Sequence, residues 1–274
     1  MIFLKAMDTI NSKKITEIQH EILSFYSDHK RNLPWRETTN PYHILISEFM
    51  LQQTQVSRVI TYYHKWIKRW PTITDLSGAN FQEVLLNWMG LGYNRRSRYL
   101  HESSKIIVEE YDGDILLAMH TYQNLPGIGK YTARAVRIFA GNEDIATVDT
   151  NIRRILIQLF DLPITISDKK LFEIAEKCVP KGKSCIWHNA LMDYGALKLT
   201  SRKTGIKPKT TQSTFKGSDR EIRGKILRML LDGPCEFKEF QTNLQIKSDR
   251  LNEILEKMKQ DQMINQRSTS YHIR

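Results

Sequence analysis

One carboxylate of the chain lies inside an apolar stretch. Glu48 stands in PYHILISEFMLQQTQV, residues 41–56, among side chains that favour a buried helix. An ionised carboxylate is costly to bury unless it is paired or neutralised. A chain rarely keeps such a group without a partner or a task, so Glu48 is a candidate functional residue.

A second carboxylate, Asp149, follows an apolar turn and heads a predicted helix in IATVDTNIRRIL, residues 145–156. Asn151 lies two positions later. Aspartate is a favoured N-cap residue, because its side chain accepts a hydrogen bond from a free backbone N–H of the first helical turn. Capping alone therefore explains Asp149, and a catalytic role needs support from other parts of the chain.

A glycine-bearing turn lies between two predicted helices. In NLPGIGKYTARAV, residues 124–136, Gly127 and Gly129 allow backbone N–H groups to approach a phosphate. The helix that starts near Lys130 adds its dipole, and Lys130 and Arg134 would add positive charge. The turn predicts a helix-hairpin-helix element, which holds the DNA backbone without reading its sequence.

Composition favours a nucleic-acid partner and a reducing compartment. The 274 residues include 41 Lys and Arg against 30 Asp and Glu, a formal net charge of +11, and a basic balance suits a polyanion. The three cysteines, Cys178, Cys185 and Cys235, are irregularly spaced. They predict a cytoplasmic location and no metal site. We expect no membrane span, because no apolar run reaches about 18 residues, and no secretory signal, because the N-terminus soon turns polar.

Helical periodicity dominates the elements that must position these groups, so the sequence predicts an all-α fold. Strand-like alternation is nearly absent before the end of the chain. The predicted helices cover residues 15–29, 41–70 (one or two helices), 80–89, 94–111, 129–140, 149–160, 168–178 and 186–199.

The end of the chain has a different composition. Residues 198–216 carry six basic residues and no acidic one, which fits either a solvated linker or a basic arm that contacts phosphates. Three short helical patterns and a final hairpin follow, and this order is typical of a winged helix. Such modules bind DNA or protein, or serve only as packing domains, and the sequence leaves these uses open.

Six blocks of the sequence together resemble the adenine DNA glycosylase (MutY) family of the helix-hairpin-helix DNA glycosylase superfamily. They lie in order over roughly residues 15–200. The blocks are LPWR (33–36), PYHILISEFMLQQTQV (41–56), WMGLGYNRRSRYLH (88–101), LPGIGKYTA (125–133), VDTNIRR (148–154) and LMDYGALKLT (191–200). LQQTQV and GLGY are the most discriminating segments.

The resemblance gives both carboxylates a role in cleaving a glycosidic bond. Glu48 matches the general acid of the family, which apolar neighbours keep protonated so that it can donate to N7 of an extruded adenine. Asp149 matches the aspartate that, as an anion, stabilises the positive charge that develops on the deoxyribose. Asn151 would help to hold that site together.

The resemblance also assigns DNA contacts. An extruded base leaves a hole in the duplex, and Gln53 and Tyr93 would wedge near the orphaned partner base. Otherwise Gln53 is a helix-surface amide and Tyr93 is a core aromatic residue. Arg95, Arg96 and Arg98 follow the wedge, and we expect at least one of them to contact phosphate.

Tyr131 stands at the hairpin position where relatives that also cut the DNA backbone carry a Schiff-base lysine. The resemblance therefore implies a monofunctional glycosylase without efficient lyase action, with Tyr131 in the catalytic site. A tyrosine here does not decide the substrate, because adenine glycosylases and thymine–guanine mismatch glycosylases of the superfamily can both carry it.

The chain departs from the family at two places. Most members hold a 4Fe–4S cluster on four cysteines, whose positions here are Leu199, Ile206, Lys209 and Phe215. We therefore expect no iron–sulfur cluster and no other cofactor, although backbone carbonyls of the hairpin turn could hold potassium or sodium. Most members also end in a β-rich domain that recognises 8-oxoguanine, and the tail here is shorter and mostly helical. This leaves the preference for 8-oxoguanine over guanine open.

Three functions follow from these observations. The first is the removal of adenine opposite 8-oxoguanine or guanine from double-stranded DNA by a monomeric enzyme. The second is the removal of thymine or uracil opposite guanine, and the third is DNA binding without catalysis. The expected modules are residues 1–35 with 144–200, residues 36–143 with the hairpin, a basic linker at 201–217 and a winged-helix-like domain at 218–274. Asp149 would lie at the cleft between the first two modules.

Overall fold

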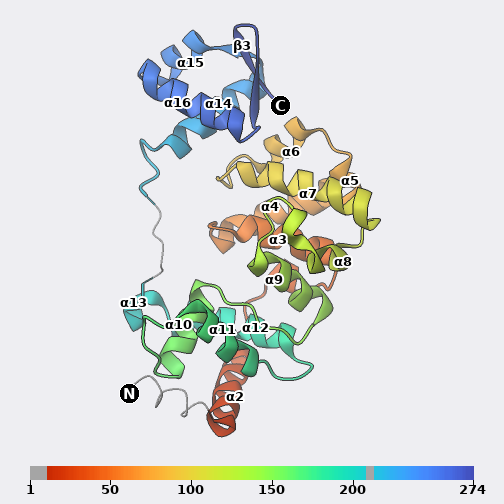
Figure 1. Ribbon diagram of the computed structural model, residues 1–274, viewed down its shortest axis with the longest axis vertical. Coiled ribbons are helices and arrows are strands. Elements are labelled where there is room, and N and C mark those ends of the chain that lie inside the picture. Colours follow the sequence, from red (N-terminus) through yellow and green to blue (C-terminus); the bar gives the residue numbers. More distant parts are fainter. Residues whose placement is uncertain (1–10, 208–212) are drawn as a thin grey trace. The chain divides into compact units, whose positions relative to one another are not determined.

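The computed structural model describes residues 11–207 and 213–274, which are predominantly helical, as predicted (Figure 1). The described residues divide into two compact units. The first lies within Met1–Glu48, Leu116–Tyr122 and Ile128–Thr211, and the second within Phe49–Ile115, Gln123–Gly127 and Gln212–Arg274. The module boundaries drawn from the sequence, at residues 36–143 and 144–200, follow a different partition and stay a prediction.

The first unit combines helices from both sides of the hairpin turn. They are α2 (Ser12–His29), η1 (Pro34–Arg36), most of α3 (Pro41–Leu51) and of α8 (Ile115–His120), α9 (Lys130–Gly141), α10 (Thr150–Leu159), α11 (Asp168–Lys177), α12 (Ser184–Asp193), the π-helical turn η3 (Tyr194–Lys198) and α13 (Ser201–Thr204). Apolar residues at helical spacing meet in one core, which includes Ile22, Ile155 and Trp187.

A buried carboxylate ties the N-terminal segment to α12. Asp193 is 0% exposed and accepts hydrogen bonds from Nε of Arg31 at 2.6 Å and from Nη1 of Arg36 at 2.9 Å. Burial alone raises the pKa of Asp193, but the hydrogen bonds and charges of Arg36 and Arg31 together bring that pKa below its ordinary value. The ion pairs therefore fix the turn at residues 31–36 on α12.

The second unit contains the helices between α3 and the hairpin turn, together with the C-terminal module. The former are α4 (Val56–Arg69), α5 (Ile73–Ser77), α6 (Phe81–Trp88) and α7 (Arg95–Tyr111). Trp66 and Trp88 pack edge to face in its interior, with ring centroids 5.5 Å apart. The helical pattern over residues 41–70 forms two helices, because the chain leaves the helical conformation at Gln53, where φ is +56°.

Two short helical elements, α5 and η2 (Tyr122–Asn124), could not be predicted from helical periodicity. Helix α5 has only five residues, too few to display a 3.6-residue period. It is marked instead by a capping box, in which Thr72 accepts from the backbone N–H of Asp75 at 3.1 Å and the Asp75 carboxylate accepts from the N–H of Thr72 at 3.0 Å. The 3₁₀ turn η2 leads into the hairpin turn.

The C-terminal module has the predicted winged-helix-like order. Helices α14 (Asp219–Asp232), α15 (Phe237–Leu244) and α16 (Ser248–Gln260) pack beside a small antiparallel sheet (Figure 1). Its strands β1 (Cys235–Glu236), β2 (Ile264–Arg267) and β3 (Ser270–Ile273) lie in the order β1-β3-β2, with Ile264 opposite Ile273. Strand β1 has only two residues, so it shows no alternation in the sequence.

The segment predicted as a basic linker, residues 201–217, begins with ordered structure. Ser201–Thr204 forms α13, and Ile206 is 6% exposed in the core of the first unit. Residues 208–212 lie outside the described residues, and residues 213–217 are exposed. Residues 201–206 therefore belong to the first unit rather than to a linker.

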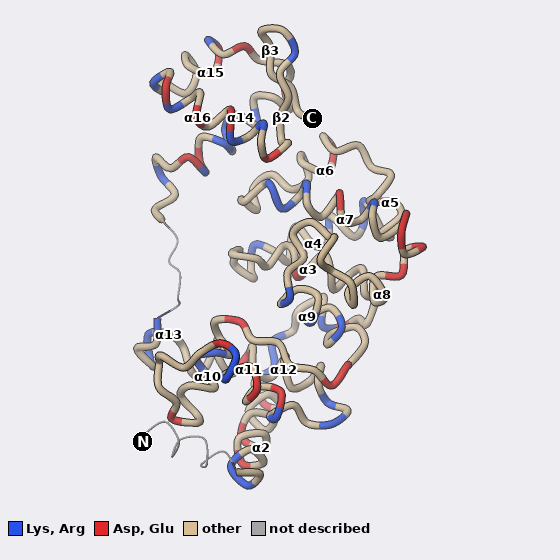
Figure 2. Tube along the Cα trace, viewed as in Figure 1, with Lys and Arg blue, Asp and Glu red and all other residues tan. Residues whose placement is uncertain are grey.

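Basic residues are spread along the helices of both units and do not gather on one element (Figure 2). The residues that give the net charge of +11 are therefore distributed over the chain and do not form one basic element. Over residues 11–207 and 213–274, the structure contains no helix with the length and apolar character of a membrane span.

Candidate active site

Glu48 lies in a part of α3 that is almost completely buried. It is 8% exposed, and its neighbours Leu45, Ile46 and Phe49 are 0% exposed. Burial raises the pKa of Glu48 from its ordinary value to about 7, and the nearby charge of Asp149 adds to the shift. The apolar run of α3 therefore produces a carboxyl group that can carry a proton near neutral pH.

Asp149 caps the N-terminus of α10, and its negative charge contributes to the raised pKa of Glu48. One carboxylate oxygen accepts from the backbone N–H of Ile152 at 2.7 Å, and the other accepts from Nδ2 of Asn151 at 3.0 Å. Burial raises the pKa of Asp149 above its ordinary value, and these hydrogen bonds and the charge of Arg154 offset part of that rise. Capping and a role in the site are therefore compatible, since the same hydrogen bonds orient the carboxylate and favour its anionic form.

A chain of contacts behind Asp149 was not predicted from the sequence. Nη2 of Arg154 donates to Oδ1 of Asn151 at 2.9 Å and to the carbonyl of Gly195 at 3.0 Å. Nε of Arg154 donates to the carbonyl of Leu199 at 2.7 Å. Arg154 therefore links Asn151 to the π-helical turn η3, which is a conformation often found at functional sites.

Tyr131, near the start of α9, lies within the electrostatic field of both carboxylates. Burial is the main cause that raises its pKa well above the ordinary value, and the charges of Glu48 and Asp149 add to it. The phenol is therefore neutral at physiological pH. Glu48, Tyr131, Asp149 and Asn151 all belong to the first unit, so the structure brings together the four residues predicted to be catalytic.

The hairpin turn needs glycine at one of its two predicted positions. Gly127 has a φ of +74°, and a Cβ there would lie 2.8 Å from Cβ of Tyr99 and 3.0 Å from Cε1 of Phe49. Gly129 precedes α9 as its N-cap with a φ of −95°, and a Cβ there would meet nothing within 4 Å. The free N-terminus of α9 keeps the form expected of a phosphate site, and binding of phosphate or of a monovalent cation there stays a prediction.

The two basic residues of this hairpin have different surroundings. Lys130 is exposed, with Nζ 4.3 Å from the ring centroid of Phe172, so it remains suited to a phosphate. Arg134 is partly buried, pairs with Glu176 and donates to the backbone carbonyl of Ala146. Its observed contacts hold α9 to the segment before α10 and to α11, in addition to any contact with DNA.

Gln53 and Tyr93, the predicted wedge residues, both adopt left-handed backbone conformations. Their φ angles are +56° and +47°. Such conformations are unfavourable for residues other than glycine and are concentrated at ligand-binding and switch sites. Gly90 and Gly92, also with positive φ, shape the turn that leads to Tyr93. Both residues belong to the second unit.

Arg96 has a structural role in place of the predicted phosphate contact. It is 7% exposed, and burial lowers its pKa to about 10. Nη1 donates to the carbonyls of Phe49 and Gln52, both at 2.7 Å, and Nη2 donates to the carbonyl of Gly92 at 2.9 Å. The guanidinium therefore joins the end of α3 to the turn before Tyr93. The sequence does not reveal that Arg96 is buried, because its basic neighbours are typical of an exposed segment.

Arg95 and Tyr93 contact the C-terminal module. Nη1 of Arg95 pairs with Oδ1 of Asp261 at 2.8 Å, and the hydroxyl of Tyr93 accepts a hydrogen bond from Arg220. Arg95 is therefore engaged in an ion pair, although half of its side chain remains exposed. Arg220 was not among the predicted site residues, because it lies 127 positions from Tyr93 in the chain.

The positions that correspond to cluster cysteines do not fit an iron–sulfur cluster. Leu199 packs against the core of the first unit, Ile206 is buried in that core, and Phe215 is 59% exposed. Lys209 lies outside the described residues. None of these side chains offers a thiolate. The absence of a cluster stays a prediction, which iron analysis and the visible absorption of the purified protein would test.

Sequence comparisons place these residues in a known context. Residues 46–181 match the model of the HhH-GPD superfamily base excision DNA repair proteins. The adenine DNA glycosylase of Mycolicibacterium smegmatis is 37% identical over 252 residues, which cover 84% of this chain and 85% of that protein. The adenine DNA glycosylase of Rattus norvegicus is 35% identical over 242 residues, and the match covers 84% of this chain but only 46% of the rat protein.

Solved structures agree on the fold. A thermostable thymine-DNA glycosylase is 31% identical and superimposes with a TM-score of 0.64 over 70% of this chain and 90% of its own. Endonuclease III, in a trapped covalent intermediate with DNA, is 19% identical, with a TM-score of 0.62 over 73% of this chain and 92% of its own. The second likeness concerns the fold alone. On the sequence relationship, the chain belongs to the helix-hairpin-helix superfamily of base-excision DNA glycosylases and, within it, to the adenine DNA glycosylase family.

Proposed function

We propose that this DNA glycosylase removes adenine mispaired with guanine or 8-oxoguanine from double-stranded DNA by hydrolysing the N-glycosidic bond. One observation carries the proposal: two carboxyl groups share a site but have different surroundings. Glu48 lies among apolar side chains with its pKa raised to about 7, whereas Asp149 accepts two hydrogen bonds. Hydrogen bonds to a carboxylate favour its charged form and apolar surroundings favour the neutral acid, so this difference supports Glu48 as the acid and Asp149 as the anion.

The proposed reaction uses both groups in turn. Protonated Glu48 donates to N7 of the extruded adenine, the bond between C1′ and N9 breaks, and the electron pair of that bond leaves with the neutral base. The Asp149 carboxylate stabilises the positive charge that develops on the deoxyribose. Water then adds to C1′ and returns a proton to Glu48. The products are free adenine and an abasic site, and the acid is restored.

We further propose that base release occurs without efficient strand cutting. A lyase step needs an amine that forms a Schiff base with C1′ of the sugar. The hairpin position that carries such a lysine in bifunctional relatives is Tyr131 here, and its phenol remains neutral. We also propose that the enzyme acts as a monomer, since both carboxyls come from one unit of a single chain. Sedimentation with and without duplex tests this stoichiometry.

A second candidate function is the removal of thymine or uracil opposite guanine. The similarity to the thermostable thymine-DNA glycosylase, at 31% identity, favours it. The adenine function is favoured by the sequence blocks LQQTQV and GLGY and by the relatives from bacteria and mammals that are named adenine DNA glycosylases.

The test compares Glu48→Gln with wild type in a single turnover on a duplex that contains A opposite G, with chromatography of the released base. General acid catalysis contributes about 10²- to 10⁴-fold, so we expect a loss in that range while the Kd for the duplex changes little. Glu110→Gln, at an exposed position of α7, is the matched control. A Glu48→Gln variant that releases adenine at the wild-type rate contradicts the proposal.

A further inference from the structure

The C-terminal module packs directly against the other helices of the second unit. Leu85 of α6 shares one apolar core with Leu227 of α14. At the edge of this contact, Asp261, which follows α16, pairs with both Arg95 of α7 and Arg223 of α14. The module thus shares apolar contacts with α6 and has an ion pair with α7 at the rim of these contacts.

A cavity of about 1040 Å³ is lined by residues of α14 and by residues of the two turns that carry Gln53 and Tyr93. Its lining includes the wedge residues Gln53 and Tyr93 together with Arg220 and Arg228 of α14. Seven basic side chains line the cavity against two acidic ones, Glu221 and Asp261. Walls of one predominant sign concentrate counter-charged ligands, so the cavity suits a polyanion.

Two arginines of α14 are placed to receive such a ligand. Arg220 stacks over the Tyr93 ring, with Cζ 5.1 Å from the centroid, and donates to its hydroxyl. The side chain is held there by a second hydrogen bond, from Nη2 to the carbonyl of Ser213 at 2.6 Å. Arg228 is exposed, and no hydrogen bond or ion pair joins it to another described residue. A phosphate at Arg228 would therefore displace no existing contact.

The helix that usually reads DNA in a helix-turn-helix fold is poorly suited to that task here. Helix α16 carries as many acidic as basic residues. Arg250 pairs with Asp219 at 2.8 Å, and Lys259 pairs with Glu256 at 2.6 Å. Only Lys257, among the basic residues of α16, has no such partner in the described structure. The helix would thus bring carboxylates toward the phosphates of a major groove.

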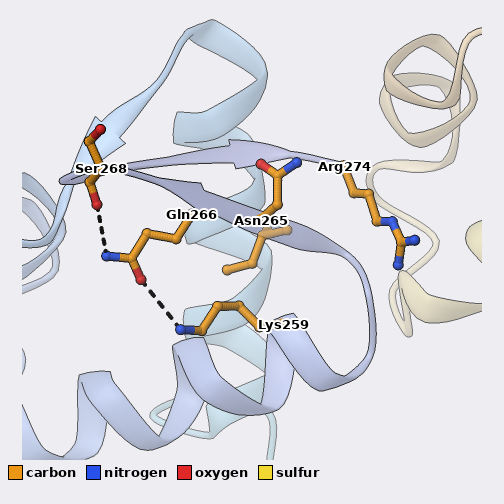
Figure 3. Close-up of a pocket in the computed structure, with 6 residues that line it drawn as sticks. Lys259, Asn265, Gln266, Ser268 and Arg274 are labelled. Atoms are coloured by element: carbon orange, nitrogen blue, oxygen red, sulfur yellow. Dashed lines mark hydrogen bonds between the residues drawn. The ribbon is translucent and has the colours of Figure 1, made fainter.

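The hairpin formed by β2 and β3 also contacts Lys259. In Figure 3, the side chain of Gln266 lies between Lys259 and Ser268. Nζ of Lys259 donates to Oε1 of Gln266 at 3.3 Å, and Nε2 of Gln266 donates to the carbonyl of Ser268 at 3.2 Å. The polar groups that would face DNA from α16 and the hairpin are thus partly occupied with one another.

We propose that the C-terminal module is a second DNA-binding wall that uses α14 rather than α16. Arg220 and Arg228 contact the DNA strand that carries the base opposite the extruded one, and Arg228 binds one of its phosphates. The inference rests on the proposed function, because Gln53 and Tyr93 mark the orphaned base only in a protein that extrudes the other base. Contacts with the base opposite the extruded one would then come from this wall.

Duplex binding tests the proposal in the full-length chain. The probe contains 2′-fluoro-2′-deoxyadenosine opposite guanine, which keeps its glycosidic bond, and fluorescence anisotropy gives the Kd over a range of salt concentrations. We expect Arg220→Ala and Arg228→Ala to weaken binding, and Arg228→Ala to lower the slope of log Kd against log salt by about 1. Lys257→Ala, an exposed residue of α16, is the matched control and should leave both quantities unchanged.

Two results would overturn the proposal. Weaker binding by Lys257→Ala with unchanged binding by Arg228→Ala would show that α16 contacts DNA. Tighter binding by Arg220→Ala would show that the module shields Tyr93 from DNA instead of adding to its grip. Base release is measured separately with ordinary A:G duplex. If the variants change DNA binding as expected but the wild type releases no adenine, the proposed function is contradicted, whereas the assignment of α14 as a DNA-binding surface is supported.

Discussion

At the scale of single residues, the proposed chemistry depends on two carboxyl groups, Glu48 as the acid and Asp149 as the anion. The rate of base release should fall as pH rises through about 7, because the reaction needs the protonated form of Glu48. Above that pH the rate should drop about tenfold per pH unit, provided that base release is rate-limiting. Single-turnover rates between about pH 6 and pH 9 measure this profile. A rate that stays flat over this range, in wild type as in Glu110→Gln, contradicts the assignment of Glu48 as the acid.

The same shifted group should make the protein less stable at high pH. The pKa of Glu48 is raised in the folded state, so folding favours its proton, and stability falls as pH rises from the unfolded value near 4.5 to about 7. The full cost, about 3 kcal/mol, is present above pH 7. We expect Glu48→Gln to be more stable than wild type by up to that amount at about pH 8 and nearly equal at about pH 4.5. Urea unfolding at both pH values measures the difference, and equal stabilities at the higher pH would argue against a costly buried charge.

At the scale of elements, the π-helical turn η3 packs closely against Asn151. Gly195 lies so close that an added Cβ would be 3.0 Å from Cδ1 of Ile155 and 3.2 Å from Cβ of Asn151. Gly195→Ala should therefore displace Asn151, with a loss of about 1–3 kcal/mol in stability and on the order of 100-fold in the rate of base release. Gly78→Ala is the control, since its Cβ would make an ordinary contact at 3.7 Å. A Gly195→Ala enzyme with unchanged rate would show that Asn151 does not depend on η3.

The contact between α12 and the N-terminal segment should depend on Asp193. Asp193→Asn removes the charge between Arg31 and Arg36, and breaking a buried pair in this way costs about 3–5 kcal/mol. Because the folded pKa is lowered, the stabilisation is present above the ordinary pKa of aspartate and is lost as pH falls through the folded value. Thermal or urea unfolding measures it. Glu83→Gln, which breaks the exposed pair with Arg69, should cost about 1 kcal/mol or less, and equal effects of the two substitutions would contradict this account.

The range of each interaction along the chain decides what the sequence could predict. Glu48 in its apolar run, Asp149 at a helix start and the Gly127 turn are local patterns, and the structure places these features as expected. Arg154 reaches carbonyls more than 40 residues away, which no local pattern reports.

Burial of charged groups is equally hidden from local patterns. Arg96 lies in a basic run that predicts an exposed side chain. In the structure it is buried and donates to backbone carbonyls of α3 and of the turn that precedes α7. Asp193 meets Arg31 across 162 positions. Short elements such as α5 and β1 escape periodicity because they are shorter than the pattern that would reveal them.

At the scale of the whole molecule, the account requires that a single chain extrudes one base, releases it and leaves the sugar–phosphate backbone intact. The proposed catalytic carboxyls belong to the first unit and the proposed wedge residues to the second, so a test of the function needs both units. Released base is therefore the most direct readout, because it reports extrusion, chemistry and substrate choice together.

The decisive measurement is single-turnover base release on duplexes that contain A:8-oxoguanine, A:G, T:G or U:G, each analysed with and without hot alkali. We predict free adenine from the first two duplexes and strand cuts that appear mainly after alkali. Release of thymine or uracil without release of adenine would contradict it and assign the pocket to pyrimidines.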